Sequence, residues 1–444
     1  MITEDLASKI AEISYDELPK EVIFQAKLCF LDFLAVAMRG SNSPSGKIVK
    51  EIFNCEKDEA IVGLDGLSLI DAAFCNGVFA HSLDLDDGHR HAQLHPGCAV
   101  IPAALAAADF HKKTGKELLE AIVAGYQVSI LLGKLSNPMH RNNGFHSTGT
   151  CGTFGAAAAA CKILELNEEK IINALGLAGT QAAGLLESDH AGTMGKHLHA
   201  GKAAQGGVLA ALLGEKEFTG AKSIIDGKQG FYRAMVSDSD VPMMENSWKE
   251  MDKDRYHILD VYFKQYPLCR HLHSSIDAAR FIKAKMEAEG SKLGDIRRIN
   301  IRTYEIAAEH DNYHPETVED LRQSLPFAVA ISLIKGAPNT ENMEITELTR
   351  SLALKTFIET DAKFDGSYPS KRPSEISVET ENGVYNCLVD LPHGEPENPL
   401  DLQDLTQKFQ QLNPSSNVEL MNTIEQIESI YIHDFMEMLN LNIK

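Results

Sequence analysis

Carboxylate and imidazole side chains are concentrated in residues 81–97, HSLDLDDGHRHAQLHPG. The three aspartates and four histidines of this stretch are Asp84, Asp86, Asp87, His81, His89, His91 and His95. Apolar runs before and after it, LIDAAFCNGVFA and CAVIPAALAAADF, predict two buried helices that hold these groups in place. Carboxylates and imidazoles at the mouth of a rigid helix pair are suited to proton transfer. Taken alone, the stretch also fits a solvated acidic loop with helix-capping residues.

Within this stretch, His81 and Asp84 lie three residues apart at the end of the first predicted helix. That spacing predicts that both side chains share one face of the helix, whereas Asp86 diverges. The proline after His95 restricts the backbone, so we expect its imidazole to face a set direction. A lone histidine on an apolar helix is more often a packed core residue than a catalyst, and this interpretation stays open for His81.

A second polar cluster, GFHSTGT, places His146 just ahead of a predicted helix, with Ser147 and Thr148 as the expected caps. The helix dipole at such a position lowers the pKa of an imidazole and favours a nearby anion. A third cluster, MGKHLHAG, contributes the ammonium group of Lys196 ahead of a further helix. Both clusters therefore offer groups that can hold an anion.

The fourth cluster, CRHLH, supplies Arg270 and His273 next to another predicted helix start. Ser274 or Ser275 is the expected cap of that helix. We interpret His271, which lies between the two functional candidates, as a surface or packing group. The cluster therefore adds a guanidinium group and one more imidazole to the set.

Together the clusters supply a carboxylate, several imidazoles, an ammonium group and a guanidinium group. This set fits a substrate with two or three carboxylates and proton abstraction next to one of them. Two other classes stay open. A metal-dependent hydrolase would use His89, His91 and Asp87, although no HExxH motif occurs. A non-catalytic carboxylate-binding protein would keep the cations but tolerate loss of Asp84 and His95. No G-x-S-x-G motif indicates a serine nucleophile.

The composition is that of an ordinary globular protein and limits its partners. Of 444 residues, 44% are hydrophobic and 24% charged, and the length favours two domains. A net charge of −21 argues against a nucleic acid or an anionic membrane as partner, but a local basic pocket can still bind a small anion. The cysteines are scattered without a CxxC pair, and the N-terminus MITEDLASKI does not have the pattern of a signal peptide. No apolar run is interpreted as membrane-spanning, so we expect a cytoplasmic protein with reduced thiols.

The secondary-structure pattern predicts a mainly α protein with a second, smaller α+β domain. Residues 1–265 read as almost wholly helical, whereas convincing strands are confined to residues 266–395. There, RRINIRTYE predicts a strand, Asn382-Gly383 predicts a hairpin turn, and a buried helix over 321–335 is interrupted near Pro326. Two further helices, 402–412 and 418–439, are expected to pack back on the helical domain. We therefore assign 1–265 and 396–444 to a large all-helical domain.

Five blocks along the chain resemble successive motifs of the MmgE/PrpD family. They are HSLDLDDGHRHAQLHPG, GFHSTGTCGTFGAAAAACKIL, MGKHLHAGKAAQGGVLAALL, YPLCRHLHSSIDA and YPSKRPSEISVETENGVYNCLVDLPHGEPENPL. The family includes 2-methylcitrate dehydratase, cis-aconitate decarboxylase and iminodisuccinate epimerase. The resemblance implies a homodimer whose subunits have a large helical domain and a smaller α+β domain, without a metal or organic cofactor.

The resemblance also implies the site residues. Those that fall on the family's functional positions are Asp84, His95, His146, Lys196, Arg270, His273 and, by a looser match, Tyr313. Family members often carry a threonine after the paired aspartates, where this chain has Gly88 followed by His89. A hydroxyl group is lost there, and we expect the His89 imidazole to take its place.

We therefore expect a cofactor-free lyase of a small di- or tricarboxylate, in the first place a dehydratase of the 2-methylcitrate type. The substrate carboxylates are expected to be held by His89, His146, Lys196 and Arg270. His95 or Asp84 removes the proton next to a carboxylate, and Lys196 belongs to the same catalytic set. His273 or Tyr313 protonates the departing hydroxyl. A decarboxylase of the cis-aconitate type and an epimerase of the iminodisuccinate type need the same constellation and stay open.

Overall fold

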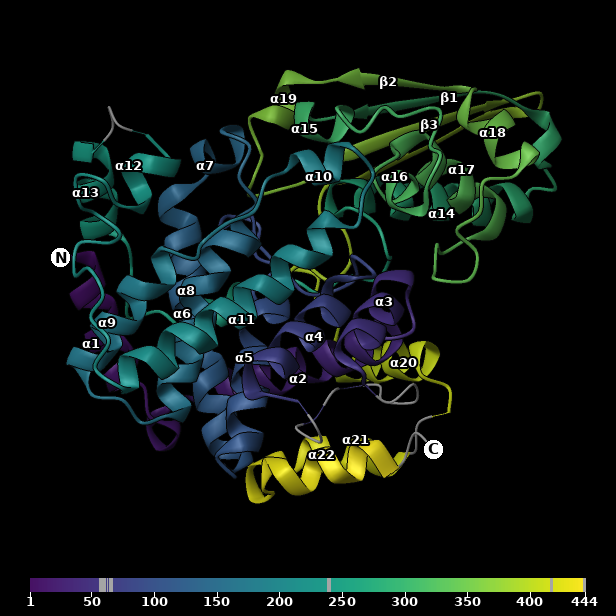
Figure 1. Cartoon of the computed structure of the whole chain (residues 1–444). Helices are drawn as coiled ribbons and strands as arrows, with labels where there is room; N and C mark the ends of the chain where they lie inside the picture. Colours follow the sequence, from purple (N-terminus) through teal and green to yellow (C-terminus); the bar gives the residue numbers. More distant parts are fainter. Residues whose placement is uncertain (56–60, 62, 64–66, 238–240, 416–417, 442–444) are drawn as a thin grey trace.

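The protein folds into a helical part and a smaller part that contains a sheet (Figure 1). This computed structural model describes residues 1–441 except 56–60, 62, 64–66, 238–240 and 416–417. The strands among these residues form one four-stranded sheet, and helices make up most of the rest. The predicted fold class, a large helical unit with a smaller α+β unit, is confirmed.

The helical part is built around long apolar helices. They are α2 (Lys20–Gly40), α4 (Leu69–His81), α5 (Gly97–Phe110), α6 (Gly115–Ser136), α8 (Ser147–Ile163) and α11 (Gly195–Glu215). Small residues let these helices approach closely: a Cβ atom on Gly155 of α8 would lie 2.7 Å from the carbonyl oxygen of Gly125 of α6. The polar stretch 81–97 joins α4 to α5, so two buried helices fix its ends, as predicted.

The length of α6 corrects one sequence prediction. Contrary to the expectation that no apolar run reaches membrane-spanning length, this helix is long and apolar enough to do so. However, 89% of its most apolar window is buried inside the protein. Its apolar surface is therefore accounted for by packing in the core.

The sheet has the strand order β2-β1-β3-β4. Its strands are β1 (Ile296–Thr303), β2 (Thr356–Thr360), β3 (Ser374–Thr380) and β4 (Gly383–Val389). β1 pairs in parallel with β2 and antiparallel with β3, and β3 and β4 form the hairpin predicted at Asn382-Gly383. Alternate side chains of β1 and β3 are buried under α14 (His273–Ala288) and α17 (Leu325–Lys335). The predicted helix over 321–335 is interrupted as expected, because α16 (Val318–Arg322) ends before Pro326 opens the first turn of α17.

The C-terminal helices return to the helical part. Its apolar core contains residues from Ile2 to Phe263 and again from Leu400 to Leu439, whereas a second core spans Tyr266 to Tyr385. Helix α20 (Leu402–Leu412) has the predicted bounds. The predicted helix over 418–439 is broken into α21 (Val418–Glu425) and α22 (Ile432–Leu441), because the backbone between them hydrogen-bonds to the start of α6. The domain boundaries at 265/266 and 395/396 stay predictions.

Candidate active site

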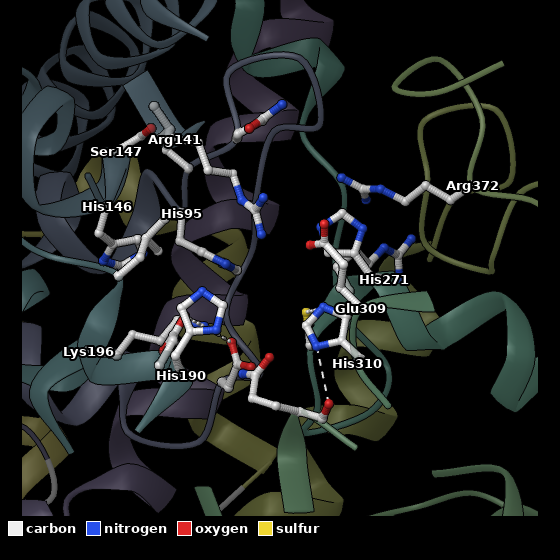
Figure 2. Close-up of a pocket in the computed structure, with 18 of the residues that line it drawn as sticks. His95, Arg141, His146, Ser147, His190, Lys196, His271, Glu309, His310 and Arg372 are labelled. Carbon is white, nitrogen blue, oxygen red and sulfur yellow. Dashed lines mark hydrogen bonds and ion pairs between the residues drawn. The ribbon is translucent and has the colours of Figure 1, made fainter. Parts of the chain in front are cut away.

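The helical part and the sheet-containing part meet at one cavity of about 220 Å³. Polar residues that line it from the helical part, here called the helical wall, include Asp84, His95, Arg141, His146 and Lys196. Those from the other part, called the small-domain wall, include Cys269, Arg270, His271, His310 and Arg372. Figure 2 shows the two walls facing each other. The volume lies below the roughly 300–1,000 Å³ of pockets for drug-sized ligands, so the cavity suits a small molecule.

The cavity brings together five of the eight residues that the sequence singled out for the site. These five are Asp84, His95, His146, Lys196 and Arg270, from segments far apart along the chain. His89, His273 and Tyr313 do not line it. Sequence reasoning missed Arg141 and His310, which no motif marks, and Lys264, a single lysine in the apolar stretch VYFKQYP.

Asp84 holds two ammonium groups. Its Oδ1 accepts hydrogen bonds from Lys264 Nζ at 2.9 Å and from Lys196 Nζ at 3.2 Å, and Lys264 is fully buried. Burial raises the pKa of Asp84, but Lys196 and Lys264 outweigh it and bring the pKa well below the usual range. A carboxylate in that state is a weak base, so this geometry suits Asp84 to positioning Lys196 more than to removing a proton.

His81 pairs with Asp86, not with Asp84. Helix α4 ends at His81, and Asp84 then takes a left-handed conformation with φ of 49°, which turns its side chain away from the helix face. His81 Nδ1 lies 2.8 Å from Asp86 Oδ2 instead. The prediction that Asp84 shares the direction of His81 is therefore wrong, because the expected extra turn of helix does not form.

His95 presents one ring nitrogen to the cavity. Its Nδ1 lies 2.6 Å from the carbonyl oxygen of Asp87, which accepts the Nδ1 proton and leaves Nε2 as the free nitrogen. The His81 and His95 rings lie 5.0 Å apart. Burial lowers the pKa of His95 to about 3, so its imidazole is neutral. The backbone at His95 is also held, since its N–H donates to Thr148 Oγ1 at 3.0 Å.

Among the described residues, one group has the spacing for a metal ion: ligand atoms of His81, Asp86 and His95 lie within 4.8 Å of one another. The alternative set from the sequence, His89, His91 and Asp87, is not such a group. In the group of His81, Asp86 and His95, the Nδ1 atom of His81 is already hydrogen-bonded to Asp86, and that of His95 to the carbonyl oxygen of Asp87. The chemistry of this donor set fits a hydrogen-bonded proton-transfer group better than a metal site.

His146 is itself the residue that precedes α8, and the predicted caps are wrong. The helix begins at Ser147, and neither Ser147 nor Thr148 caps its N-terminus. His146 Nδ1 lies 3.1 Å from Nδ1 of His199. The pKa of His146 is lowered well below its usual value, as predicted, but burial and then neighbouring cationic groups are the causes. His146 therefore offers a neutral imidazole to the cavity.

The two arginines of the small-domain wall share one buried carboxylate. Arg270 Nε and Arg372 Nη1 lie 3.1 Å and 3.0 Å from Glu395 Oε1, and Glu395 is fully buried. Both guanidinium groups also stack on the ring of Tyr262, at 4.6 Å and 5.1 Å. Arg270 thus lies at the cavity as predicted, although Glu395 already neutralises part of the positive charge there.

The structure places His271, and not His273, at the cavity. Residues Arg270–Leu272 form a 3-10 turn, and α14 begins at His273 without a serine cap. His273 consequently lies in the core, where its Nδ1 accepts from Arg270 Nη1 at 3.0 Å. His271, predicted to be a packing group, lines the cavity, with its Nδ1 2.6 Å from the Tyr304 hydroxyl. The sequence could not separate the two because the turn decides which side chain faces inward.

His89 does not replace the missing threonine hydroxyl. Its Nδ1 accepts from the Ala92 N–H at 3.0 Å, away from the cavity. A Cβ atom on Gly88 would lie 2.3 Å from the hydroxyl oxygen of Tyr262, which does line the cavity. The ring of Tyr262 therefore fills the space that a side chain at position 88 would need.

Tyr313 also lies outside the cavity. Its hydroxyl donates to the carbonyl oxygen of Thr356 at 3.2 Å, at the start of strand β2. The tyrosines that line the cavity are Tyr262 and Tyr368. Tyr313 therefore does not lie at the cavity, where the loose match to the family tyrosine predicted it.

Arg141 is a cation at the cavity without a carboxylate partner among the residues that the structure describes. Figure 2 shows its guanidinium group pointing into the space between the two walls. Lys196, Arg270 and Arg372, in contrast, are each paired with a carboxylate. Arg141 is therefore the cation best placed to bind a carboxylate that enters from outside.

Asp87 holds the polar stretch 81–97 in place through hydrogen bonds to helices α5 and α6. Its Oδ1 accepts from the Gly97 N–H at 3.0 Å, and its Oδ2 lies 2.6 Å from the Tyr126 hydroxyl. Burial, with Asp32 and Asp86 nearby, raises the pKa of Asp87 to about 8. The folded protein therefore keeps a proton on this group that the unfolded chain loses above about pH 4.

We expect Asp87→Asn to reduce the pH dependence of stability between pH 5 and 8. Below the unfolded pKa both states are protonated, and as pH rises towards 8 the wild type loses up to about 1.4 kcal/mol per pH unit from this group. Asparagine cannot titrate but keeps the shape of a neutral acid. Urea unfolding at several pH values measures the effect, and parallel pH profiles for the two proteins would contradict it.

Sequence models of known domains match nearly the whole chain. The MmgE/PrpD N-terminal domain matches residues 4–244 and the MmgE/PrpD C-terminal domain matches residues 266–432. The cis-aconitate decarboxylase of Homo sapiens is 28% identical, with 97% of this chain and 90% of that protein aligned. That of Aspergillus terreus is 24% identical over 100% and 96%. The 2-methylcitrate dehydratase of Escherichia coli (strain K12) is 26% identical over 77% and 75%.

Proposed function

The chain belongs to the MmgE/PrpD family, and from this premise we propose that it is a lyase acting on a small di- or tricarboxylate. The observation that carries the proposal is the cavity. In it, the guanidinium group of Arg141, which has no carboxylate partner among the described residues, and the ammonium group of Lys196 face imidazoles of two walls. Guanidinium and ammonium groups bind carboxylates, and imidazoles transfer protons. The expected homodimer and cytoplasmic location stay predictions.

Decarboxylation of a cis-aconitate-like acid is the first candidate reaction. Loss of carbon dioxide needs no base to remove a proton from carbon, so the cavity has only to hold the carboxylates and supply an acid. The relatives named as cis-aconitate decarboxylases also align with nearly the whole chain. Dehydration of a 2-methylcitrate-like acid, first in the sequence-based expectation, becomes the second candidate, supported by a relative of that name.

The negative charge of a bound substrate favours protonation of the imidazoles at the cavity. A carboxylate near a neutral imidazole favours the protonated form, so binding of a polycarboxylate raises the pKa values of His95 and His271. Arg141 and Lys196 hold the carboxylates that stay on the substrate. When the carbon–carbon bond to the leaving carboxylate breaks, the electron pair remains on carbon beside another carboxylate or a double bond. An acid on the cavity wall then supplies the proton that forms the new carbon–hydrogen bond.

A panel of acids followed by NMR in heavy water tests the proposal. The purified protein is incubated with cis-aconitate, 2-methylcitrate and iminodisuccinate, with and without EDTA. We expect carbon dioxide loss from cis-aconitate at a rate that EDTA leaves unchanged. Water loss from 2-methylcitrate supports the second candidate instead. Exchange or inversion without net reaction indicates an epimerase, and inertness towards all three acids overturns the proposed activity.

Replacing Arg141 by alanine is expected to lower kcat/KM by about tenfold to a hundredfold, mostly through a higher KM. The reason is loss of a charge-assisted hydrogen bond to a substrate carboxylate, worth about 1.5–3 kcal/mol. Arg141→Lys should recover part of the loss, since lysine keeps the charge but not the forked geometry. Arg350→Ala, at an exposed position on α18 (Glu347–Ala353), is the matched control. Equal KM values for Arg141→Ala and the control would show that Arg141 does not bind the substrate.

A further inference from the structure

Cys269 and His310 form a pair on the small-domain wall. The Cys269 sulfur lies 3.6 Å from His310 Nε2, and both residues line the cavity. Figure 2 shows His310 on the side of the cavity opposite His95 and Lys196. The Cys269 backbone is fixed by a hydrogen bond from its N–H to the carbonyl oxygen of Arg322 at 3.0 Å. The thiol is thus held at one place, facing the space that the substrate occupies.

The surroundings of His310 set the direction of proton transfer in this pair. Its Nδ1 lies 3.1 Å from the carbonyl oxygen of Gln323, which can only accept, so Nδ1 carries a proton. Nε2 is therefore the nitrogen that exchanges a proton with the Cys269 sulfur. A thiol, an imidazole and an orienting acceptor in this order form the arrangement that activates cysteines.

Cys269 and His310 share one proton, which can sit on the sulfur or on His310 Nε2. Burial raises the pKa of the Cys269 thiol, but His310 outweighs it and brings that pKa to about 7. Burial lowers the pKa of His310, and Cys269 outweighs this so that the pKa rises. The other charged or titratable groups around the pair include Asp84 and Lys196 across the cavity and Arg141 from the short helix α7 (Met139–Asn142). His271, Arg372 and the hydroxyl groups of Tyr262, Tyr304 and Tyr368 lie on the same side as the pair.

We propose that Cys269 and His310 are the proton donor of the small-domain wall and that Cys269 protonates the substrate carbon on the face opposite His95. The inference rests on the proposed lyase function and names a catalytic pair for it. As the carbon–carbon bond breaks, its electron pair stays on the substrate carbon. In the form of the pair that carries the shared proton on sulfur, the Cys269 sulfur–hydrogen bond breaks, the carbon–hydrogen bond forms, and a thiolate remains beside neutral His310. Solvent at the cavity mouth returns one proton to the pair, which balances the proton that decarboxylation consumes.

The first experiment measures the thiol without any turnover. Iodoacetamide alkylation of the wild type is followed by peptide mass spectrometry across pH 5–10, with Cys387 on β4, remote from the cavity, as the internal control. We expect Cys269 to react with a midpoint near pH 7 and to be protected by cis-aconitate. In His310→Asn the midpoint should move up towards that of an ordinary thiol. An unchanged midpoint in that variant, or no protection, overturns the pairing.

The second experiment measures catalysis in Cys269→Ala, Cys269→Ser and His310→Asn, after their folding is checked by thermal unfolding. We expect kcat in Cys269→Ala to fall by about a hundredfold with KM within a few-fold, and deuterium from heavy water to enter the product without preference for one face. Near-normal kcat in Cys269→Ala and His310→Asn, with an active wild type, overturns this inference alone. A wild type inert towards all three acids overturns the proposed function and this inference together.

Discussion

Replacing His95 by alanine is expected to lower turnover by about a hundredfold or more while the protein stays folded. The imidazole presents Nε2 to the cavity, because its Nδ1 is held by the carbonyl oxygen of Asp87. Alanine removes the imidazole that becomes cationic beside the bound polycarboxylate. It leaves Asp87 bonded to Gly97 and Tyr126, so the polar stretch keeps its support. Steady-state kinetics on the best acid of the panel measures the loss.

Lys196→Ala is expected to have an effect of the same size through a different group. Lys196 Nζ lies at the cavity, 3.2 Å from Asp84, and Lys264 still neutralises Asp84 when Lys196 is removed. The matched controls are Lys202→Ala, exposed on the same helix, and His314→Ala, exposed in the sheet-containing part. Near-normal turnover in both His95→Ala and Lys196→Ala would favour a non-catalytic carboxylate-binding protein instead.

The largest expected effect on stability comes from Asp84→Ala. The change leaves the fully buried ammonium group of Lys264 without the carboxylate oxygen that lies 2.9 Å away. Breaking a buried ion pair by removal of one partner costs about 3–5 kcal/mol of the free energy of unfolding. Urea unfolding measures this loss, and Asp16→Ala, at an exposed position outside the cavity, serves as control.

The double variant Asp84→Ala/Lys264→Met separates stability from function. Removal of both charges relieves the unpaired ammonium group, so we expect half or more of the lost stability to return. Turnover should stay low, because Lys196 has lost its hydrogen bond to Asp84 and keeps only the longer contact with Asp189 at 3.6 Å. Wild-type stability in Asp84→Ala, or recovery of turnover in the double variant, would show that the two lysines do not depend on Asp84.

Short-range patterns predicted most of the elements around the site. The helices on either side of residues 81–97, the Asn382-Gly383 hairpin and the break before Pro326 all follow from apolar periodicity and turn chemistry, which act over a few residues. The same patterns did not predict that α4 stops at His81 or that a 3-10 turn precedes α14. These two local endings redirected Asp84 and His273, because one residue more or less of helix rotates a side chain by about 100°.

Motif order and periodicity, which are properties of neighbouring residues, were enough to predict the family, the two-part architecture and the polar segments that meet at the cavity. Which side chain of each segment faces the cavity, and what charge it carries, depends on the packing of distant segments. Burial and ion pairing depend on residues distant in the chain: Lys264 lies beside Asp84, and Tyr262 fills the space next to Gly88. Glu395 likewise neutralises part of the charge of Arg270, whereas Arg141, unmarked by any motif, has no carboxylate partner in the described part of the chain.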